Sequence, residues 1–538
     1  MTELLLITQV FFVCAMTVFV LSNMKSRGEK KNVLKQHAEE KLEELRALRH
    51  VHLAMPLSEK TRPSAMGEIV GQEEGIRALT AALCGKNPQH ILIYGPPGVG
   101  KTCAARLALE MAKQSPGTPF AADAKFIEMD ATCIRFDERS IADPLIGSVH
   151  DPIYQGAGAY GQAGLPQPKP GAVTKANGGV LFLDEIGELH PVQLNKLLKV
   201  MEDRKVFFES AYYSKADKNI PEYIHQIFQR GMPADFRLIG ATTRQPSEIP
   251  PALRSRVVEV FFRPLDPEEL TYIAANGAKK GGLPIDKEAL QLIAEYSENG
   301  RDAVNMVQMA VGLAEAGDKR FIEKGDVRFI IENGRYSRRY LPKAKPGNRV
   351  GCVYGLAVAG PSQGILLEIE AVAKRAASGE GSWKVTGFAE REEMEGGGKR
   401  LGRQSAAMAS MESVATMLEA CAGIRVREYD LHIHVSGGMM VDGPSAGLAI
   451  AVCLYSAIRG IPVPGEAAFT GEMGLRGEIR PVGGVREKLE AAKKAGVRTA
   501  YIPADNAGEY TGELRAVPVS HFSQVLKELF GETIRQGA

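Results

Sequence analysis

The hydrophobic and polar positions along the chain change their period several times, and each change marks a different kind of predicted element. From about residue 63 to residue 265, short apolar runs such as "HILIYG", "VLFLDE" and "FRLIGATT" alternate with helical stretches. Apolar runs without polar alternation are typical of strands that are buried on both faces of a parallel sheet. We therefore expect residues 63–265 to form an α/β domain, with helices covering a parallel sheet.

The pattern beyond residue 265 indicates two further units. Residues 266–340 have helical periodicity only, as in "DPEELTYIAANGAKK", and predict a small helical domain. The basic segment "RRYLPKAKPGNRVG" contains proline and glycine and is typical of a linker. Strand-like runs, "GLAVAG" and "ILLEIEAVA", then open a third globular unit, so residues 341–538 are expected to form a separate domain.

The N-terminal region has a different pattern. Leu4–Leu21 carries no charged residue and is nearly long enough, at about 1.5 Å per residue, to cross a hydrocarbon core of about 30 Å. Glu3 precedes this run, whereas lysine and arginine follow from Lys25 onward, which is the charge asymmetry of an uncleaved anchor rather than of a signal peptide. The sequence thus predicts a single-pass transmembrane anchor at 1–24, a charged helical linker at 25–62, and catalytic domains in the cytoplasm.

Composition narrows the classes of function. The 538 residues are 44% hydrophobic and 24% charged, with a net charge of +2. A nucleic-acid-binding protein usually has a concentrated basic surface, so nucleic acid is not expected as the main partner. The seven cysteines are scattered and none are spaced as CxxC, which indicates neither a disulfide framework nor a zinc site.

The segment "HILIYGPPGVGKT" predicts a nucleotide site. It is an apolar strand followed by the pattern G-x-x-x-x-G-K-T, whose members are Gly95, Pro96, Pro97, Gly98, Val99, Gly100, Lys101 and Thr102. Glycines allow backbone N–H groups to surround phosphates, Lys101 brings a positive charge to the terminal phosphates, and Thr102 offers a hydroxyl to Mg²⁺.

A second strand, in "GGVLFLDEIGEL", ends in Asp184 and Glu185. Such carboxylates can bind Mg²⁺ and orient the attacking water, respectively.

With these motifs, residues 63–340 resemble an AAA+ ATPase. The resemblance implies ATP and Mg²⁺ as cofactors, with Thr102 and Asp184 on the metal. It also implies a sensor 1 residue in "LIGATTR", which is Thr243 or its neighbour Thr242. The segment "PPALRSR" resembles the one that carries the arginine finger, with Arg256 the better match and Arg254 the second.

Two further segments of this region contain candidate functional residues. "GRDAVN" resembles the sensor 2 segment of the lid, which gives Arg301. Tyr154 and Tyr160, in the glycine-rich "DPIYQGAGAYGQAG", are candidates for pore-loop residues that contact polypeptide.

The C-terminal unit contains a serine in an unusual place. In "VDGPSAGLAIAVCLYSA", Ser445 lies between a Gly-Pro turn and an apolar run that predicts a buried helix. A serine in this position is often an N-cap, since its hydroxyl can accept a bond from the first turn. It can also be a nucleophile, because the N–H groups and the dipole at a helix N-terminus can stabilise an oxyanion.

Three motifs favour the nucleophile. "DGPSAG", "TGE" and "GGxxEKLxAA" occur in this order, and from about Gly351 onward the chain resembles the Lon protease domain, in particular the membrane-anchored bacterial LonB type. The resemblance implies an ATP-dependent serine protease that unfolds and degrades cytoplasmic proteins. Ser445 would be the nucleophile and Lys488 the base, and Thr470 would be a supporting residue that hydrogen-bonds the lysine and holds its orientation. It also implies a homohexamer whose proteolytic sites face an internal chamber.

Alternatives remain for the base and for the function. Lys488 shares one side of its predicted helix with Leu489 and Ala492, so it can be buried and its pKa lowered. His432 and His434, on one face of the strand in "YDLHIHV", are the rival bases. A different class of function is an AAA+ remodelling protein or nucleic-acid motor whose Lon-like domain no longer cleaves.

Overall fold

A computed structural model describes most of the chain from residue 55 onward. The described residues are Met16, 41–46, 48, 55–134, 143–150, 166–210, 213–216, 220–339, 342–360, 363–377, 379–387, 391–396, 399–404, 406–436 and 444–531. The chain divides into two compact units, Met1–Lys60 and Thr61–Ala538, and the described part of the first includes α2 (Leu57–Lys60). The pore-loop candidates Tyr154 and Tyr160 lie outside the described residues.

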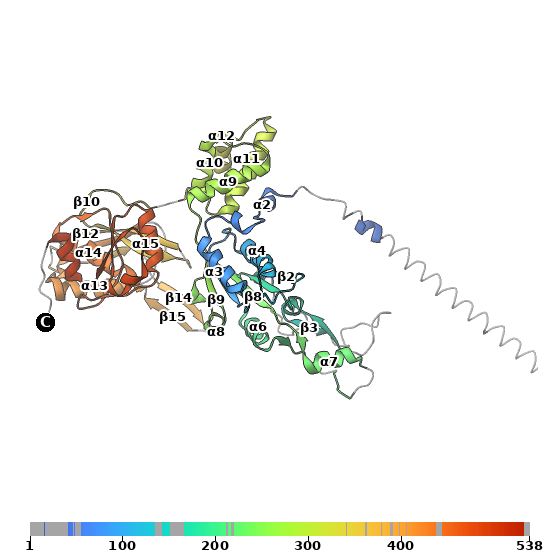
Figure 1. The fold of residues 1–538 in the computed structure, drawn as a ribbon. Helices are drawn as coiled ribbons and strands as arrows, with labels where there is room; N and C mark the ends of the chain where they lie inside the picture. The colour runs from blue at the N-terminus through green and yellow to red at the C-terminus, as the bar shows by residue number, and fades with distance from the viewer. Residues whose placement is uncertain are drawn as a thin grey trace, which may run out of the picture. The chain divides into compact units, whose positions relative to one another are not determined.

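The first domain of the second unit contains a five-stranded parallel sheet (Figure 1). Its strands, in spatial order, are β2 (Phe126–Asp130), β5 (Val180–Asp184), β8 (Arg237–Thr242), β1 (Ile91–Tyr94) and β9 (Val258–Phe261). The residues of β1 are all buried, as are the first four of β5, which agrees with their uninterrupted apolar sequences. Because the strands are parallel, β1, β5 and β8 end at the same edge, where Tyr94 pairs with Thr242 and Asp130 pairs with Asp184.

The main helices of this domain are α3 (Glu73–Leu83), α4 (Lys101–Gln114), α6 (Pro191–Asp203) and α7 (Glu222–Arg230), with the short α5 (Ala172–Lys175) and α8 (Pro251–Arg254).

Four helices form the next group, drawn in yellow-green in Figure 1. They are α9 (Pro267–Gly281), α10 (Lys287–Tyr296), α11 (Gly300–Ala316) and α12 (Lys324–Gly334). Asp266 and Glu269 form a capping box at the start of α9, so the first free N–H groups of that helix are satisfied. The helices α9 and α11 pack against each other, with Gly277 of α9 beside Val307 of α11.

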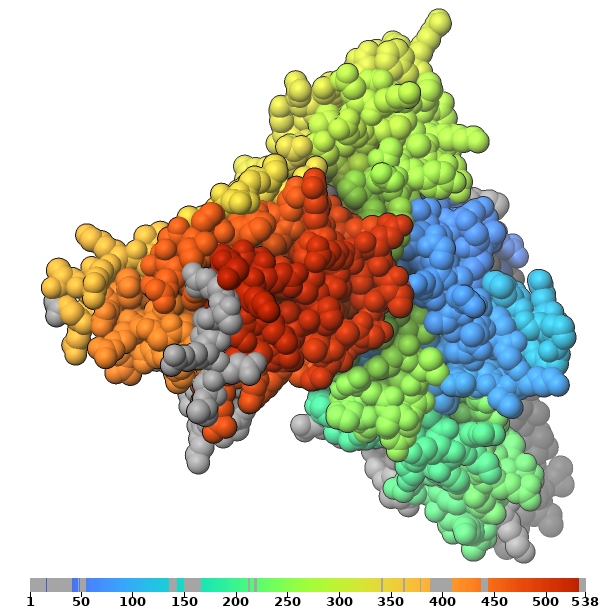
Figure 2. Space-filling view, turned by 60° about the vertical axis from the view of Figure 1, so that its left-hand side comes forward, coloured from blue at the N-terminus to red at the C-terminus, as the bar shows by residue number. Residues whose placement is uncertain are grey.

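The C-terminal domain is built on a seven-stranded mixed sheet. Its strands, in spatial order, are β13 (Trp383–Thr386), β16 (Tyr429–Ser436), β12 (Gln363–Arg375), β11 (Cys352–Ala359), β18 (Ala467–Phe469), β21 (Thr499–Pro503) and β22 (Arg515–Val519). The helices are α13 (Ala406–Ala422), α14 (Gly447–Arg459), α15 (Val485–Lys494) and α16 (Phe522–Phe530). Figure 2 shows these segments, in yellow to red, packed into one body.

Side-chain alternation along these strands divides the core of this domain in two. Ile365 and Leu367 of β12 join a cluster with α13, α14 and α16, whereas Leu366 between them joins a second cluster with α15. The helix α14 is buried along most of its length, from Gly447 to Ser456. The helix α14 thus packs in one core cluster of the sheet and α15 packs in the other.

The remaining strands of the described residues form short pairs. They are β3 (Gly147–His150) with β4 (Gln167–Pro170), β6 (Lys205–Val206) with β7 (Met232–Pro233), β10 (Asn348–Arg349) with β17 (Val463–Pro464), β14 (Arg391–Gly396) with β15 (Lys399–Gln404), and β19 (Glu472–Met473) with β20 (Ile479–Arg480).

The predicted membrane anchor needs a correction. Crossing a bilayer takes about 20 predominantly apolar residues in one helix. Within the described ranges no helix combines this length with this hydropathy. Apart from Met16, the predicted anchor lies outside those ranges. We therefore correct the prediction of an N-terminal transmembrane helix and of a single-pass, membrane-anchored protein.

Candidate active sites

The predicted phosphate-binding loop connects the end of β1 to the start of α4. Gly98 and Gly100 adopt φ angles of +70° and +96°, which side chains with a Cβ rarely adopt. Lys101 donates from Nζ to the carbonyl oxygens of Gly95 (2.6 Å) and Pro96 (3.0 Å). Burial lowers the pKa of Lys101, and the nearby Glu185 and Asp184 oppose this shift. The loop thus holds a partly desolvated cation beside two carboxylates. Thr102 is the second residue of α4 and is partly buried.

Asp184 and Glu185 stand where β5 ends. Burial raises the pKa of Asp184, and Lys101 opposes the shift, so a cation beside this carboxylate is favoured. Glu185 has a left-handed φ of +46° and accepts hydrogen bonds from Thr243 through the backbone N (3.2 Å) and Oγ1 (3.1 Å). The hydroxyl of Thr242 is instead bound by the backbone N–H of Arg244 (3.1 Å). Of the two threonines that the sequence left open, Thr243 is the one that contacts Glu185.

Arg301 lies in the first turn of α11, close to the loop. Asn299 caps this helix, since its Oδ1 accepts from the backbone N–H groups of Arg301 and Asp302 (both 3.0 Å). A Cβ on Gly98 would be only 2.4 Å from this same Asn299 Oδ1, so the loop and the start of α11 are in tight contact. Burial is the main cause of the lowered pKa of Lys101, but the charge of Arg301 contributes to it. The lid arginine therefore lies within electrostatic reach of the loop lysine.

The two arginines of "PPALRSR" have different environments. Arg254 donates from Nε to Glu259 Oε1 (2.6 Å), which also accepts from the Tyr94 hydroxyl (2.9 Å), so Arg254 is tied to β9 and β1. Arg256 donates from Nε to Glu202 of α6 (2.8 Å), and 38% of its side chain is exposed. Both are engaged within the chain, but Arg256 is held by a surface ion pair that can exchange partners at low cost.

Ser445 belongs to a short 3-10 turn, Pro444–Ala446, that leads directly into α14. The N-cap of α14 is Ala446 and no side chain caps this helix, so the capping interpretation of Ser445 is not supported. The carbonyl of Ser445 accepts from the backbone N–H of Gly471 (3.0 Å) and from Thr470 Oγ1 (3.4 Å). The backbone of the serine is therefore fixed by the residues that follow β18.

Thr470 is fully buried, and its hydrogen-bond partner differs from the expected one. The family resemblance implied a hydrogen bond to the lysine, whereas in the structure the hydroxyl is donated to the serine carbonyl. Gly471, which the sequence analysis missed, makes the shorter of the two bonds to that carbonyl. It follows the "T" of "TGE" directly, so the motif itself was the available signal.

Lys488 is buried in the first turn of α15. It is 3% exposed and shares the buried face of the helix with Val485, Leu489 and Ala492. Burial lowers the pKa of Lys488 to about 8, a shift that Glu487 and Glu509 partly oppose. A lysine with such a pKa is neutral in an appreciable fraction near neutral pH and can accept a proton.

The rival histidines have a different environment. His432 and His434 are exposed on β16, and both contact Thr386 Oγ1, through Nε2 (3.1 Å) and Nδ1 (2.9 Å) respectively. A threonine hydroxyl bridges them, not the carboxylate that orients the histidine of a serine-histidine-aspartate triad. These contacts give no support to a histidine base.

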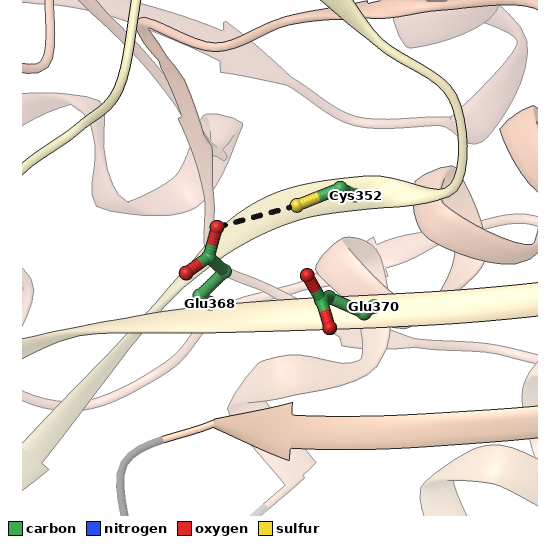
Figure 3. A group of neighbouring side chains, drawn as sticks. All are labelled: Cys352, Glu368 and Glu370. Atoms are coloured by element: carbon green, nitrogen blue, oxygen red, sulfur yellow. Dashed lines mark hydrogen bonds between the residues drawn. The ribbon is translucent and has the colours of Figure 1, made fainter.

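One cluster outside these sites brings together possible metal ligands. Figure 3 shows Cys352, Glu368 and Glu370, whose ligand atoms lie within 4.8 Å of one another. Glu368 is already paired with Arg349 and with Lys345 (3.2 Å). Burial raises the pKa of Cys352 to about 12, so the thiol keeps its proton. The cluster has the features of an ion-pair network, and we assign no metal to it.

Comparisons with known proteins agree with this architecture. Residues 329–532 match the Lon protease (S16) C-terminal proteolytic domain, and residues 65–217 match magnesium chelatase, subunit ChlI. Lon protease 2 of Bacillus subtilis (strain 168) is 50% identical over 531 residues, which are 98% of this chain and 96% of the relative. The archaeal Lon protease of Methanothermobacter thermautotrophicus is 31% identical over 431 residues, covering 72% of this chain and 63% of the relative.

Fold, sites and relatives together define the class: an AAA+ P-loop ATPase core joined to a serine protease domain. The chain belongs to the Lon protease family and is an ATP-dependent protease. The sequence-based prediction of the family and of the enzyme is thereby confirmed. The alternative, a remodelling protein or nucleic-acid motor that no longer cleaves, is set aside.

Proposed function

We propose that Ser445 and Lys488 form the catalytic dyad of this protease. The observation that carries the proposal is the burial of Lys488, which lowers its pKa to about 8. The neutral amine takes the proton of the Ser445 hydroxyl while Oγ forms a bond to the scissile carbonyl carbon. The protonated amine then gives that proton to the leaving amine as the peptide C–N bond breaks. Water then attacks the acyl-enzyme. The neutral amine takes a proton from this water and returns it to Ser445 Oγ as the ester bond breaks.

The start of α14 supports stabilisation of the oxyanion. Ser445 directly precedes Ala446, the N-cap of this helix, whose first N–H groups and dipole favour negative charge. Thr470 acts as a positioning residue, since it binds the carbonyl of Ser445. Together with Gly471 it limits how far the nucleophile can move from the helix end.

We assign ATP to the loop between β1 and α4. The close approach of Gly98 to Asn299 and the left-handed glycines fit a backbone cradle for phosphates. Thr102 and Asp184 would hold Mg²⁺, which supplies charge neutralisation at the phosphates. Lys101 binds the terminal phosphates, Glu185 orients the attacking water under the restraint of Thr243, and Arg301 adds positive charge from the lid.

The proposed assembly is a homohexamer that unfolds protein substrates and cleaves them in an internal chamber. Closed rings arise when one head-to-tail contact is repeated. In such a ring Arg256 would exchange Glu202 for the γ-phosphate of a neighbouring subunit. The exposure of its ion pair supports this exchange.

Replacement of the nucleophile tests the proposed function. We expect Ser445→Ala to abolish cleavage of a short fluorogenic peptide and of casein, whereas ATP hydrolysis stays within about twofold of the unmodified enzyme, because the ATPase residues lie in another domain. Substantial peptide cleavage by purified Ser445→Ala would contradict the dyad.

A further inference from the structure

A glycine of the C-terminal sheet lies directly under the helix that carries Lys488. Gly364 is the second residue of β12, and a Cβ built on it would lie 1.9 Å from the carbonyl oxygen of Glu487 and 2.9 Å from the backbone N of Lys488. These are backbone atoms of α15, so no side chain can rotate away to make room. The strand and the helix therefore approach each other more closely here than any residue with a side chain allows.

The same turn of α15 approaches the neighbouring strand in the same way. Val358 of β11 is the register partner of Gly364. A Cβ on Gly484, the N-cap of α15, would lie 2.7 Å from Val358 Cγ2. Glycine inside a strand usually weakens the strand and often marks a close backbone approach. Here two glycines, one on the strand and one on the helix, permit that approach.

We propose that Gly364 is a positioning residue for the protease reaction: it seats the first turn of α15 against β12 and thereby fixes the place and the desolvation of Lys488. The inference rests on the proposed role of Lys488 as the base. The backbone N of Lys488 donates to the carbonyl of Gly484 (3.1 Å), so a displacement of this turn moves Lys488 with it.

A larger residue at position 364 would push β12 and α15 apart. Contacts under 3.0 Å are essentially never made by real Cβ atoms, so an alanine would separate strand and helix by about 1 Å. A misplacement of about 1 Å at a reacting group can cost about 100-fold in rate. Water would also reach the ammonium group, and the pKa of Lys488 would rise from about 8 toward 10.5.

The test is the pH dependence of peptide cleavage by Gly364→Ala in the full-length chain with ATP. We expect kcat/KM to fall about 100-fold at neutral pH. The acidic limb of the pH profile of kcat/KM should move to higher pH, while the rate of ATP hydrolysis is unchanged. Gly508→Ala is the matched control, because Gly508 is exposed in the same domain and a Cβ there meets nothing within 4 Å. Unchanged cleavage, or a loss of rate with the acidic limb unmoved, would overturn the proposal.

A second pair of variants covers the case in which Gly364→Ala does not fold. Gly484→Ala should shift the acidic limb in the same direction. Adding Val358→Ala removes the contacted methyl group and should restore the limb, although the backbone strain at residue 484 is the same in both variants. If the acidic limb of peptide cleavage lies at the same pH in Gly484→Ala and in the double variant, the proposal is contradicted.

Failure of the inference and failure of the dyad give different results. If Lys488→Ala still cleaves peptide, the proposed base is wrong, whatever the glycine variants do. If Lys488→Ala is inactive and Gly364→Ala behaves as the unmodified enzyme, only the positioning role of Gly364 is wrong.

Discussion

Thr243 binds the carboxylate of Glu185 through two groups, its backbone N–H at 3.2 Å and its Oγ1 at 3.1 Å. Glu185 also has a φ of +46°, a conformation that costs free energy for a residue with a side chain. Both features restrain the direction of one carboxylate beside the phosphate-binding loop. The restraint makes the hydroxyl of Thr243 testable apart from its backbone.

Thr243→Val should slow ATP hydrolysis by about 10- to 100-fold. The variant keeps the backbone donor and loses the hydroxyl, and a hydrogen bond to a charged group contributes about 1.5–3 kcal/mol. Thr243→Ser retains the hydroxyl and should hydrolyse ATP at nearly the original rate. Steady-state ATPase measurements on both variants check this, and equal rates for valine and serine would show that the hydroxyl has no role.

Lys488→Met should make the protease domain more stable while it abolishes cleavage. Below pH 8 the folded state holds a buried ammonium, and the shift of its pKa from 10.5 to about 8 corresponds to a penalty of about 3 kcal/mol. Between these two values the unfolded state binds more protons, so the stability of the unmodified protein rises with pH and the advantage of Lys488→Met shrinks. Functional groups that reduce stability in this way are common at active sites.

The single tryptophan offers a direct readout of that prediction. Trp383 lies on β13, so its fluorescence during urea unfolding reports on the protease domain alone. Lys493→Met is the control on the same helix, since Lys493 is exposed and paired with the exposed Glu513. If Lys488→Met is less stable than the unmodified protein, or if its gain in the free energy of unfolding does not change with pH, Lys488 is not a destabilising buried ammonium.

Mixed rings test the proposed role of Arg256. Arg256→Ala should bind ATP and hydrolyse it poorly, because developing charge on the γ-phosphate is not neutralised. Lys101→Ala should bind ATP weakly but still present its arginine to a neighbour. Mixing the two should partly restore ATP hydrolysis. If subunit exchange is demonstrated and no activity returns, Arg256 does not act on a neighbouring subunit.

The sequence predicts those features that depend on local pattern. The uninterrupted apolar runs indicated β1 and β5 as buried strands, and the i, i+1, i+4 spacing placed Lys488 with Leu489 and Ala492 on the buried face of α15. Contacts between distant segments could not be predicted in this way. The bond from Thr470 to the Ser445 carbonyl and the approach of Gly364 to Glu487 depend on how strands and helices pack in three dimensions.

The choice between Thr242 and Thr243 shows the same limit. Thr242 is the last residue of β8 and Thr243 follows it, so which hydroxyl reaches Glu185 depends on the backbone direction at the end of this strand. The choice between lysine and histidine likewise required burial and partners, because His434 and Lys488 both carry a nitrogen that can accept a proton.

The central claim is that the neutral amine of Lys488 takes the proton of Ser445, and the pH dependence of kcat/KM for a short peptide tests it most directly. With ATP saturating, cleavage should rise through an acidic limb near pH 8, since the pKa of the buried amine is about 8 and only its neutral form accepts a proton. Lys488→Arg should be inactive throughout, because a guanidinium keeps its proton at these pH values. A limb near pH 6.5, as expected of histidine, with Lys488→Arg active and His434→Ala inactive, would contradict the account.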